Sequence, residues 1–306
     1  MIRFLLRRTG LALFVMLAVI AVVFFVLHLT GDPIGVALLG SGASADDIAR
    51  IKHELGYDRP LLEQFGSFIG GMFQGRFGNS LQYGQDSLVL TMQRLPYTLS
   101  LAGVALLLTI VVAVPLGILA AVRRGRATDR IVIGLAAFGQ SVPSFVVGPL
   151  LILVFAVGLR WFPVAGAGSP MAIVLPAVTL ALFPMSRVMR LVRTSMIEVL
   201  GADYVTTARA KGQREGVVIM RHAFRNALLA VATVIALQLT SMIGGAVIVE
   251  AVFGWPGIGS LAKDALINSD FALAQTIVII TAAGVVLINL ITDIAYSLLD
   301  PRIGLK

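Results

Sequence analysis

The feature that most constrains this fold is a set of long apolar segments, each long enough to cross a membrane. They cover residues 9–29, 97–121, 131–158, 171–192, 227–250 and 273–297. A helix of roughly 20 apolar residues spans a hydrocarbon core about 30 Å thick. A transmembrane β-barrel would show alternating segments of about ten residues instead. With 58% hydrophobic and only 13% charged residues, the chain is predicted to be an all-α integral membrane protein with six transmembrane helices.

The basic residues predict the orientation of these helices. Arg3, Arg7 and Arg8 precede the first apolar segment, which is longer than a signal-peptide core and lacks a small-x-small cleavage pattern, so we expect a retained helix. With the N-terminus inside, most of the 24 Lys and Arg residues fall on the inner side, as the positive-inside rule requires. We therefore expect both termini in the cytoplasm. The weakest span is the fourth, whose arginines at 187, 190 and 193 indicate a helix that leaves the bilayer before it ends.

Two polar stretches interrupt the spans. Residues 31–96 read as short amphipathic helices on the outer side, and residues 193–226 form the main cytoplasmic loop. That loop contains DYVTTARAKG (203–212), in which Asp203 is expected to cap a helix and Gly212 to end it in the left-handed conformation. A helix of eight residues is unstable alone, so this segment is predicted to need a partner surface. The alternative is a solvated linker helix.

Motifs for chemistry are missing from the sequence. It has no cysteine, only three histidines far apart, and no Gly-x-x-x-x-Gly-Lys-Ser/Thr loop for ATP phosphates. HELGY (53–57) has Tyr57 where a zinc-protease helix has its second histidine, and GIGSLA (257–262) lies in no βαβ unit. We therefore expect no catalytic, metal-binding or cofactor-binding residues and no enzyme activity.

Polar residues inside the predicted spans mark either a transport pathway or helix packing, because such residues are costly in lipid and often functional. The set is Gln140, Ser141, Ser144, Gln238, Ser241, Asn289 and Asp293. Interhelical hydrogen bonding is the simpler explanation for any single one of them. Asn289 and Asp293 are four residues apart and share a helical face, and Asp293 also lies near enough to the end of its span to reach the inner interface.

Several motifs in order resemble one protein family along almost the whole chain. DYVTTARAKG followed by RHAFRNALL (221–229) resembles the cytoplasmic coupling loop of permeases of type I ABC importers, in the branch that imports dipeptides, oligopeptides and nickel. The other matching stretches are GDP (31–33), LGYDRPLLEQF (55–65), GRFGNSL (75–81), RLPYTLSL (94–101), SVPSFVVG (141–148), EAVFGWPGIG (250–259) and LLDPRIG (298–304).

The resemblance implies roles for two groups of residues. A coupling helix that docks on a separate ATPase subunit would use Tyr204, Thr207, Ala208, Arg209, Ala210, Lys211 and Gly212. Thr206 stands where the broader signature has glutamate, and Ala230 where the branch usually has proline, which puts a kink at the fifth span in doubt. The outer mouth of the pathway, or a contact with the binding protein, would involve Glu250, Phe253, Trp255 and Pro256. The alternative for this second group is an interfacial anchor.

The resemblance also implies an organisation and a function. Residues 1–30 would be the N-terminal end and first helix, 31–96 the extracytoplasmic segment, 97–300 the five-helix core with the coupling loop at 193–226, and 301–306 a cytoplasmic tail. The chain would be the permease of an ATP-driven, binding-protein-dependent importer of di- or oligopeptides in a bacterial or archaeal cytoplasmic membrane. Chelated nickel or a glutathione-like solute is the alternative, and a stand-alone transporter or an intramembrane enzyme a remote one.

Implied partners are a second, similar permease chain, forming a heterodimer, one or two ATPases that bind ATP and Mg²⁺, a solute-binding protein and the lipid bilayer. No nucleic acid is expected.

Overall fold

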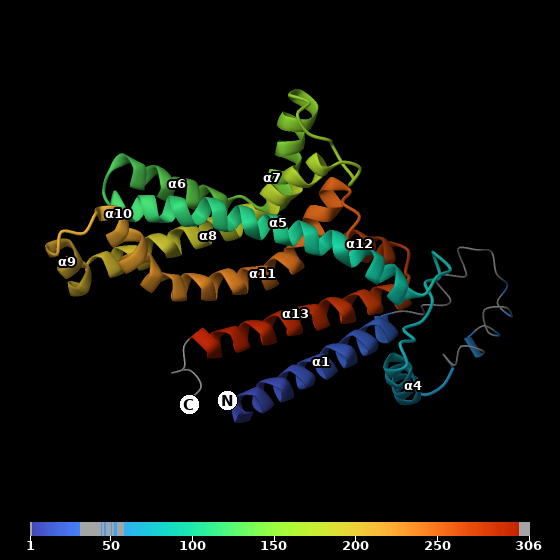
Figure 1. Cartoon of the computed structure of the whole chain (residues 1–306). Coiled ribbons are helices and arrows are strands. Elements are labelled where there is room, and N and C mark those ends of the chain that lie inside the picture. The colour runs from blue at the N-terminus through green and yellow to red at the C-terminus, as the bar shows by residue number, and fades with distance from the viewer. Residues whose placement is uncertain are drawn as a thin grey trace. The chain divides into compact units, whose positions relative to one another are not determined.

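The computed structural model describes residues 2–30, 44, 46, 50, 52–53 and 58–299, and all of their regular elements are helical (Figure 1). Three short segments are 3₁₀ or π-helical: η1 (Ile152–Gly158), η2 (Pro170–Ile173) and η3 (Val218–Phe224). The α-helices are α1 (Ile2–Thr30), α4 (Leu61–Phe73), α5 (Ser87–Val122), α6 (Ala127–Ser141), α7 (Ser144–Leu151), α8 (Val174–Leu200), α9 (Asp203–Ala210), α10 (Glu215–Val217), α11 (Arg225–Phe253), α12 (Ile258–Ile267) and α13 (Phe271–Leu299).

The predicted membrane spans are confirmed, with one change in their form. Among the described residues, five helices are long and apolar enough to cross a bilayer, and a bent helix pair supplies a sixth crossing if it is one span. The third span, predicted as one segment over 131–158, is broken, because α6 ends at Ser141 and the chain turns by 104° before α7. The cause is Pro143, which holds Val142 in extended backbone (φ −99°, ψ 119°).

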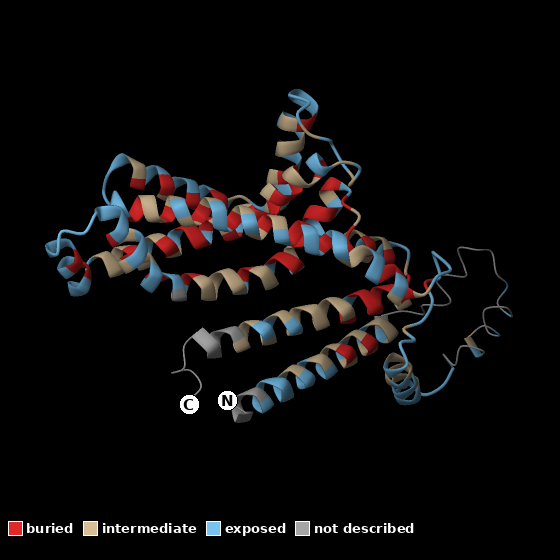
Figure 2. Ribbon diagram, in the orientation of Figure 1, coloured by how far each residue is buried: buried red, intermediate tan, exposed pale blue. Residues whose placement is uncertain are grey.

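The fourth span is longer than the short, weak helix that the sequence predicts. With η2 it forms a continuous segment, Pro170–Leu200, that passes through Pro184 without a break. This segment is also the most buried of the spans, at 56% of its apolar window against 11% for α1, and Figure 2 shows exposed residues along most of α1. Its modest hydropathy therefore reflects contact with other helices instead of lipid.

The chain divides into two compact units, which are described separately. The first comprises the residues up to Thr98 together with Pro256–Ile294, and the second comprises Leu99–Trp255. The second unit is built around α8, which packs against α6, α7 and α11. Where α5 meets α8, a Cβ atom on Gly117 would lie 2.7 Å from Val192 Cβ and 2.8 Å from Met189 O. The two backbones approach this closely only because Gly117 has no side chain.

A buried ion pair joins α6 to α8 in the second unit. Arg193 Nε and Nη2 donate to the two carboxylate oxygens of Asp129, at 2.6 and 2.9 Å, and Gly125 N donates to Asp129 Oδ2 at 2.8 Å. On the same face Arg190 donates to Gln140. These arginines therefore bond to a neighbouring helix, a use that the sequence pattern did not predict.

In the first unit, α4 confirms one amphipathic helix of the outer segment; the rest of that prediction lies mostly outside the described residues. Phe65 of α4 packs on Phe24 and Phe25 of α1, with ring centroids 5.2 and 5.4 Å apart. Buried Asp270 precedes α13 and accepts hydrogen bonds from Leu273 N at 3.2 Å and from Ser80 Oγ. These contacts fix the turns beside the long helices of this unit.

Candidate functional site

The polar loop of the second unit carries the predicted short helix, α9. It begins at Asp203 after the extended residue Ala202, and no side chain caps it. The predicted cap by Asp203 is therefore wrong, although a carboxylate in the first turn still favours the helix dipole. The predicted end is confirmed, because Gly212 has φ +72°, a conformation that costs little only for glycine.

One face of α9 packs on the chain itself. Val205 and Ala208 are buried against Val218, with Val199 and Leu200 beside them. This contact is the local surface that stabilises so short a helix. The inward position of Ala208 also removes it from the outer face, which carries the other residues of the implied ATPase contact: Tyr204, Thr207, Arg209, Ala210, Lys211 and Gly212, all exposed.

Arg209 is held in place by a carboxylate that the sequence reasoning missed. Its Nη2 and Nε donate to Glu215 Oε1 and Oε2 at 2.8 and 3.2 Å. The hydrogen bonds to Arg209 lower the pKa of Glu215, and those to Glu215 raise the pKa of Arg209. The sequence signal was the turn at Gly212, which brings a residue six positions after Arg209 back beside it. The pair joins the end of α9 to the start of α10.

A cavity of about 250 Å³ lies among the spans of the second unit, and two predicted polar residues line it. Ser144 of α7 and Ser241 of α11 meet there, with Thr179, Phe183 and Pro184 of α8. Buried Gln238 lies behind Ser241 and accepts a hydrogen bond from its Oγ at 3.3 Å. Thr179 was missed because a lone threonine in an apolar helix carries no distinctive pattern. The lining contains hydroxyls and apolar groups but no charge.

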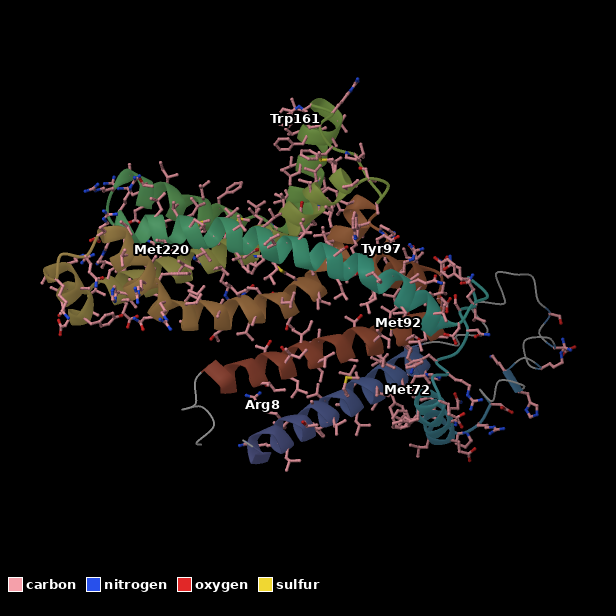
Figure 3. All side chains as sticks on the ribbon, viewed as in Figure 1. Arg8, Met72, Met92, Tyr97, Trp161 and Met220 are labelled. Carbon is pink, nitrogen blue, oxygen red and sulfur yellow. The ribbon has the colours of Figure 1, made fainter. Side chains whose placement is uncertain are left out.

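The remaining polar residues of the predicted set lie elsewhere. Gln140 accepts from Arg190, and Ser141 Oγ donates to Ala137 O at 2.9 Å. Asn289 and Asp293 belong to the first unit, where Asp293 Oδ2 lies 2.9 Å from Arg8 Nη1. Arg8, labelled in Figure 3, projects from α1. It lines a second cavity of about 180 Å³ with Asn289 and Asp293. The predicted residues therefore form separate polar groups.

The segment at the end of α11 is mostly internal. Glu250, Phe253 and Trp255 are 0%, 2% and 5% exposed, while Pro256 is half-buried. Gly254 reverses the chain with φ 56°, and Trp255 N donates to Glu250 O at 2.9 Å. In this conformation the three buried side chains pack within the protein, so Trp255 is no exposed interfacial anchor.

No group of three His, Asp or Glu side chains in the described part of the chain could hold a metal ion. What the described residues offer is a bundle of spans, an uncharged polar cavity between them and a docked helix with an exposed polar face on the main loop. These features define a polytopic helical membrane protein.

Comparison with known proteins identifies the family. The chain belongs to the binding-protein-dependent transport system inner membrane components, whose model matches residues 113–305. The N-terminal model of the same component matches residues 1–102. It is therefore a multi-pass inner-membrane permease, as predicted.

Relatives extend over the whole chain. It is 40% identical to "Probable peptide ABC transporter permease protein y4tP" of Sinorhizobium fredii, over 98% of both chains. It is 34% identical to the dipeptide transport system permease protein DppB of Escherichia coli K12, over 100% of both. The predicted resemblance to the peptide branch of ABC importer permeases is confirmed.

One solved structure shows the same fold. A chain of the MetNI methionine ABC transporter, determined in inward-facing conformations, matches with a TM-score of 0.59 at 20% identity. The match covers 69% of this chain and 96% of that one. The core helices therefore have the fold of an ABC importer permease.

Proposed function

We propose that this chain is the permease subunit of an ATP-driven importer of di- or oligopeptides. The observation that carries the proposal is full-length similarity to permeases named for peptide and dipeptide transport. The uncharged, hydroxyl-lined cavity beside Ser144, Thr179 and Ser241 supports it, since hydroxyls can donate to and accept from peptide groups of any sequence.

In the proposed mechanism the chain works with a second permease, two ATPase subunits and a solute-binding protein. ATP and Mg²⁺ bind to the ATPases, not to this chain. Closure of the ATPase pair moves α9 and, with it, the spans, so that the pathway alternates between inward-open and outward-open forms. Hydrolysis resets the cycle.

The geometry of α9 supports its role as the coupling helix. Its buried face fixes it to Val218, so a force on its exposed face reaches α10, η3 and the start of α11. Tyr204 and Lys211 project from that exposed face, where a tyrosine hydroxyl and an ammonium can bond a partner surface. Arg209, already bonded to Glu215, orients the end of the helix in addition to offering charge.

The test compares uptake with ATP hydrolysis in the reconstituted complex. Tyr204→Ala and Lys211→Glu are expected to keep ATPase activity while uptake of a labelled dipeptide falls at least about tenfold. A tenfold fall corresponds to a loss of about 1.4 kcal/mol of coupling free energy between ATPase and permease. Arg126→Glu, an exposed charge reversal in the loop before α6, is the matched control. Full, coupled uptake in both α9 variants would remove the docking role.

The solute itself is tested by competition. A dipeptide and a tripeptide should displace the label, whereas glutathione and chelated nickel should not. Displacement by chelated nickel alone would favour the nickel-importing alternative within the same architecture and exclude peptides as the solute.

A further inference from the structure

An apolar groove lies where the end of α5 meets η3, and none of its lining residues belongs to α9 or to the polar cavity. Its volume is about 410 Å³. Pro115, Ile118 and Val122 line it from α5, and Met220 and Phe224 from η3. Val122 and Met220 are 43% and 54% exposed, so the groove is open on one side. Figure 3 labels Met220 toward the end of the unit that carries α9.

The length of the groove along α5 is close to the thickness of one membrane leaflet. Val122 is the last residue of an apolar span, and Val114 lines the far end of the groove. Eight residues of helix cover about 12 Å, close to half of a hydrocarbon core about 30 Å thick. The groove is therefore long enough along α5 to hold a large part of one acyl chain.

Arginines adjoin both walls of the groove. Arg123 and Arg124 follow Val122 directly, and Arg221 and Arg225 each follow a groove residue of η3. Arg221 and Arg225 are four apart and thus share a helical face beside the face of Met220 and Phe224. Both are exposed, and neither has a side-chain partner within the described part of the chain.

We propose that this groove binds an anionic phospholipid, with one acyl chain along α5 and the phosphate at Arg221 and Arg225. Charge complementarity selects this occupant: an apolar helix of a partner chain offers these arginines no counter-charge, whereas the phosphate of a lipid supplies it. Arginine also binds phosphate through paired donors. Because η3 links α10 to α11, the lipid would stabilise the segment through which α9 connects to the fifth span.

The first experiment measures which lipids stay with the purified complex. The complex is equilibrated with mixed micelles of phosphatidylglycerol and phosphatidylethanolamine, repurified, and its lipids are counted by mass spectrometry. Wild type should retain phosphatidylglycerol selectively. In the double variant R221Q/R225Q this retention should fall roughly 25-fold, since each basic residue near an anionic headgroup contributes roughly a factor of five. Arg214→Gln, an exposed arginine outside the groove, is the matched control.

The second experiment fills the groove. Ile118→Trp should abolish retention, whereas Leu107→Trp, at a 59% exposed position of α5 outside the groove, should not. Unchanged phosphatidylglycerol in R221Q/R225Q would overturn the anionic-lipid assignment, and so would unchanged retention in Ile118→Trp. Retention is measured without transport, so this result stands apart from the proposed import function.

A third measurement distinguishes a protein occupant. The chain has no cysteine, so Met220→Cys introduces a single reactive thiol. We expect this thiol to react with a maleimide carried on phosphatidylethanolamine and to form a cross-link with no polypeptide. A cross-link to another permease chain would overturn the proposal and assign the groove to a protein interface.

Discussion

At the scale of single residues, Glu215 sets the orientation of Arg209 on the coupling loop. Its pKa lies below the ordinary value because Arg209 donates to it, so the pair's contribution to folding is complete above pH about 4.3 and is lost as pH falls through the lowered pKa. Arg209 stays charged throughout. Glu215→Gln is expected to speed amide hydrogen exchange in residues 203–211, equally at pH 6 and pH 8.

Glu198→Gln is the control for this variant, because Glu198 is exposed on α8 and outside the pair. Comparing each variant with wild type at one pH removes the intrinsic pH dependence of exchange. If Glu215→Gln and Glu198→Gln gave the same exchange pattern, the ion pair would have no part in ordering α9.

Gly212 makes a second prediction at the residue scale. Its φ of +72° is unfavourable for any residue with a Cβ, although no atom stands within 4 Å of where that Cβ would be. Gly212→Ala should therefore destabilise the loop by about 1 kcal/mol from backbone strain alone. Gly216→Ala, at a helical glycine with equally open surroundings, should be neutral or slightly stabilising. Amide exchange across residues 203–217 checks both variants, and equal exchange would exclude strain at Gly212.

At the scale of elements, the sequence predicted what local chemistry decides. The apolar lengths located the spans, and Asp203 to Gly212 delimited α9 within a residue or so. The break at Pro143 was readable in principle, because proline restricts the residue before it, yet the continuous apolar composition on both sides hid it. The burial of α8 was hidden for another reason: hydropathy does not distinguish a helix surrounded by protein from one that leaves the bilayer.

The contact between α5 and α8 gives a prediction at this scale. Gly117→Ala would place a Cβ 2.7 Å from Val192 Cβ and 2.8 Å from a backbone oxygen, so the helices must separate, at a cost of about 1–3 kcal/mol. Gly103→Ala on the same helix meets nothing within 4 Å and should leave stability unchanged or raise it slightly. Thermal unfolding of the purified complex measures both. An unchanged Tm for Gly117→Ala would mean that α5 and α8 do not pack this closely.

At the scale of the whole molecule, the sequence could not group residues that lie far apart along the chain. Ser144 and Ser241 were predicted as members of one polar set, and the cavity brings them together with Thr179 on a third helix. Asp293 was predicted as either a pathway residue or an interface residue, with no means of finding Arg8 as its partner. Pairings of this kind depend on which helices become neighbours, and neither periodicity nor composition encodes that.

The Arg8–Asp293 pair, between the first and last long helices, yields the last prediction. Arg8 is 47% and Asp293 22% exposed, so the protein itself does not enclose the pair. If Asp293 serves to hold α13 to α1, Arg8→Gln and Asp293→Asn should lower Tm and uptake together, and the exchanged pair R8D/D293R should recover most of both. If Asp293 serves the pathway, Asp293→Asn alone should abolish uptake at unchanged Tm, and the exchange should not restore it.

Arg3 and Arg7 keep the N-terminus basic in every variant, so membrane insertion should be preserved. The amount of protein in the membrane checks this. Recovery by the exchange would assign Asp293 to helix packing and leave the hydroxyl-lined cavity of the second unit as the place to seek the solute.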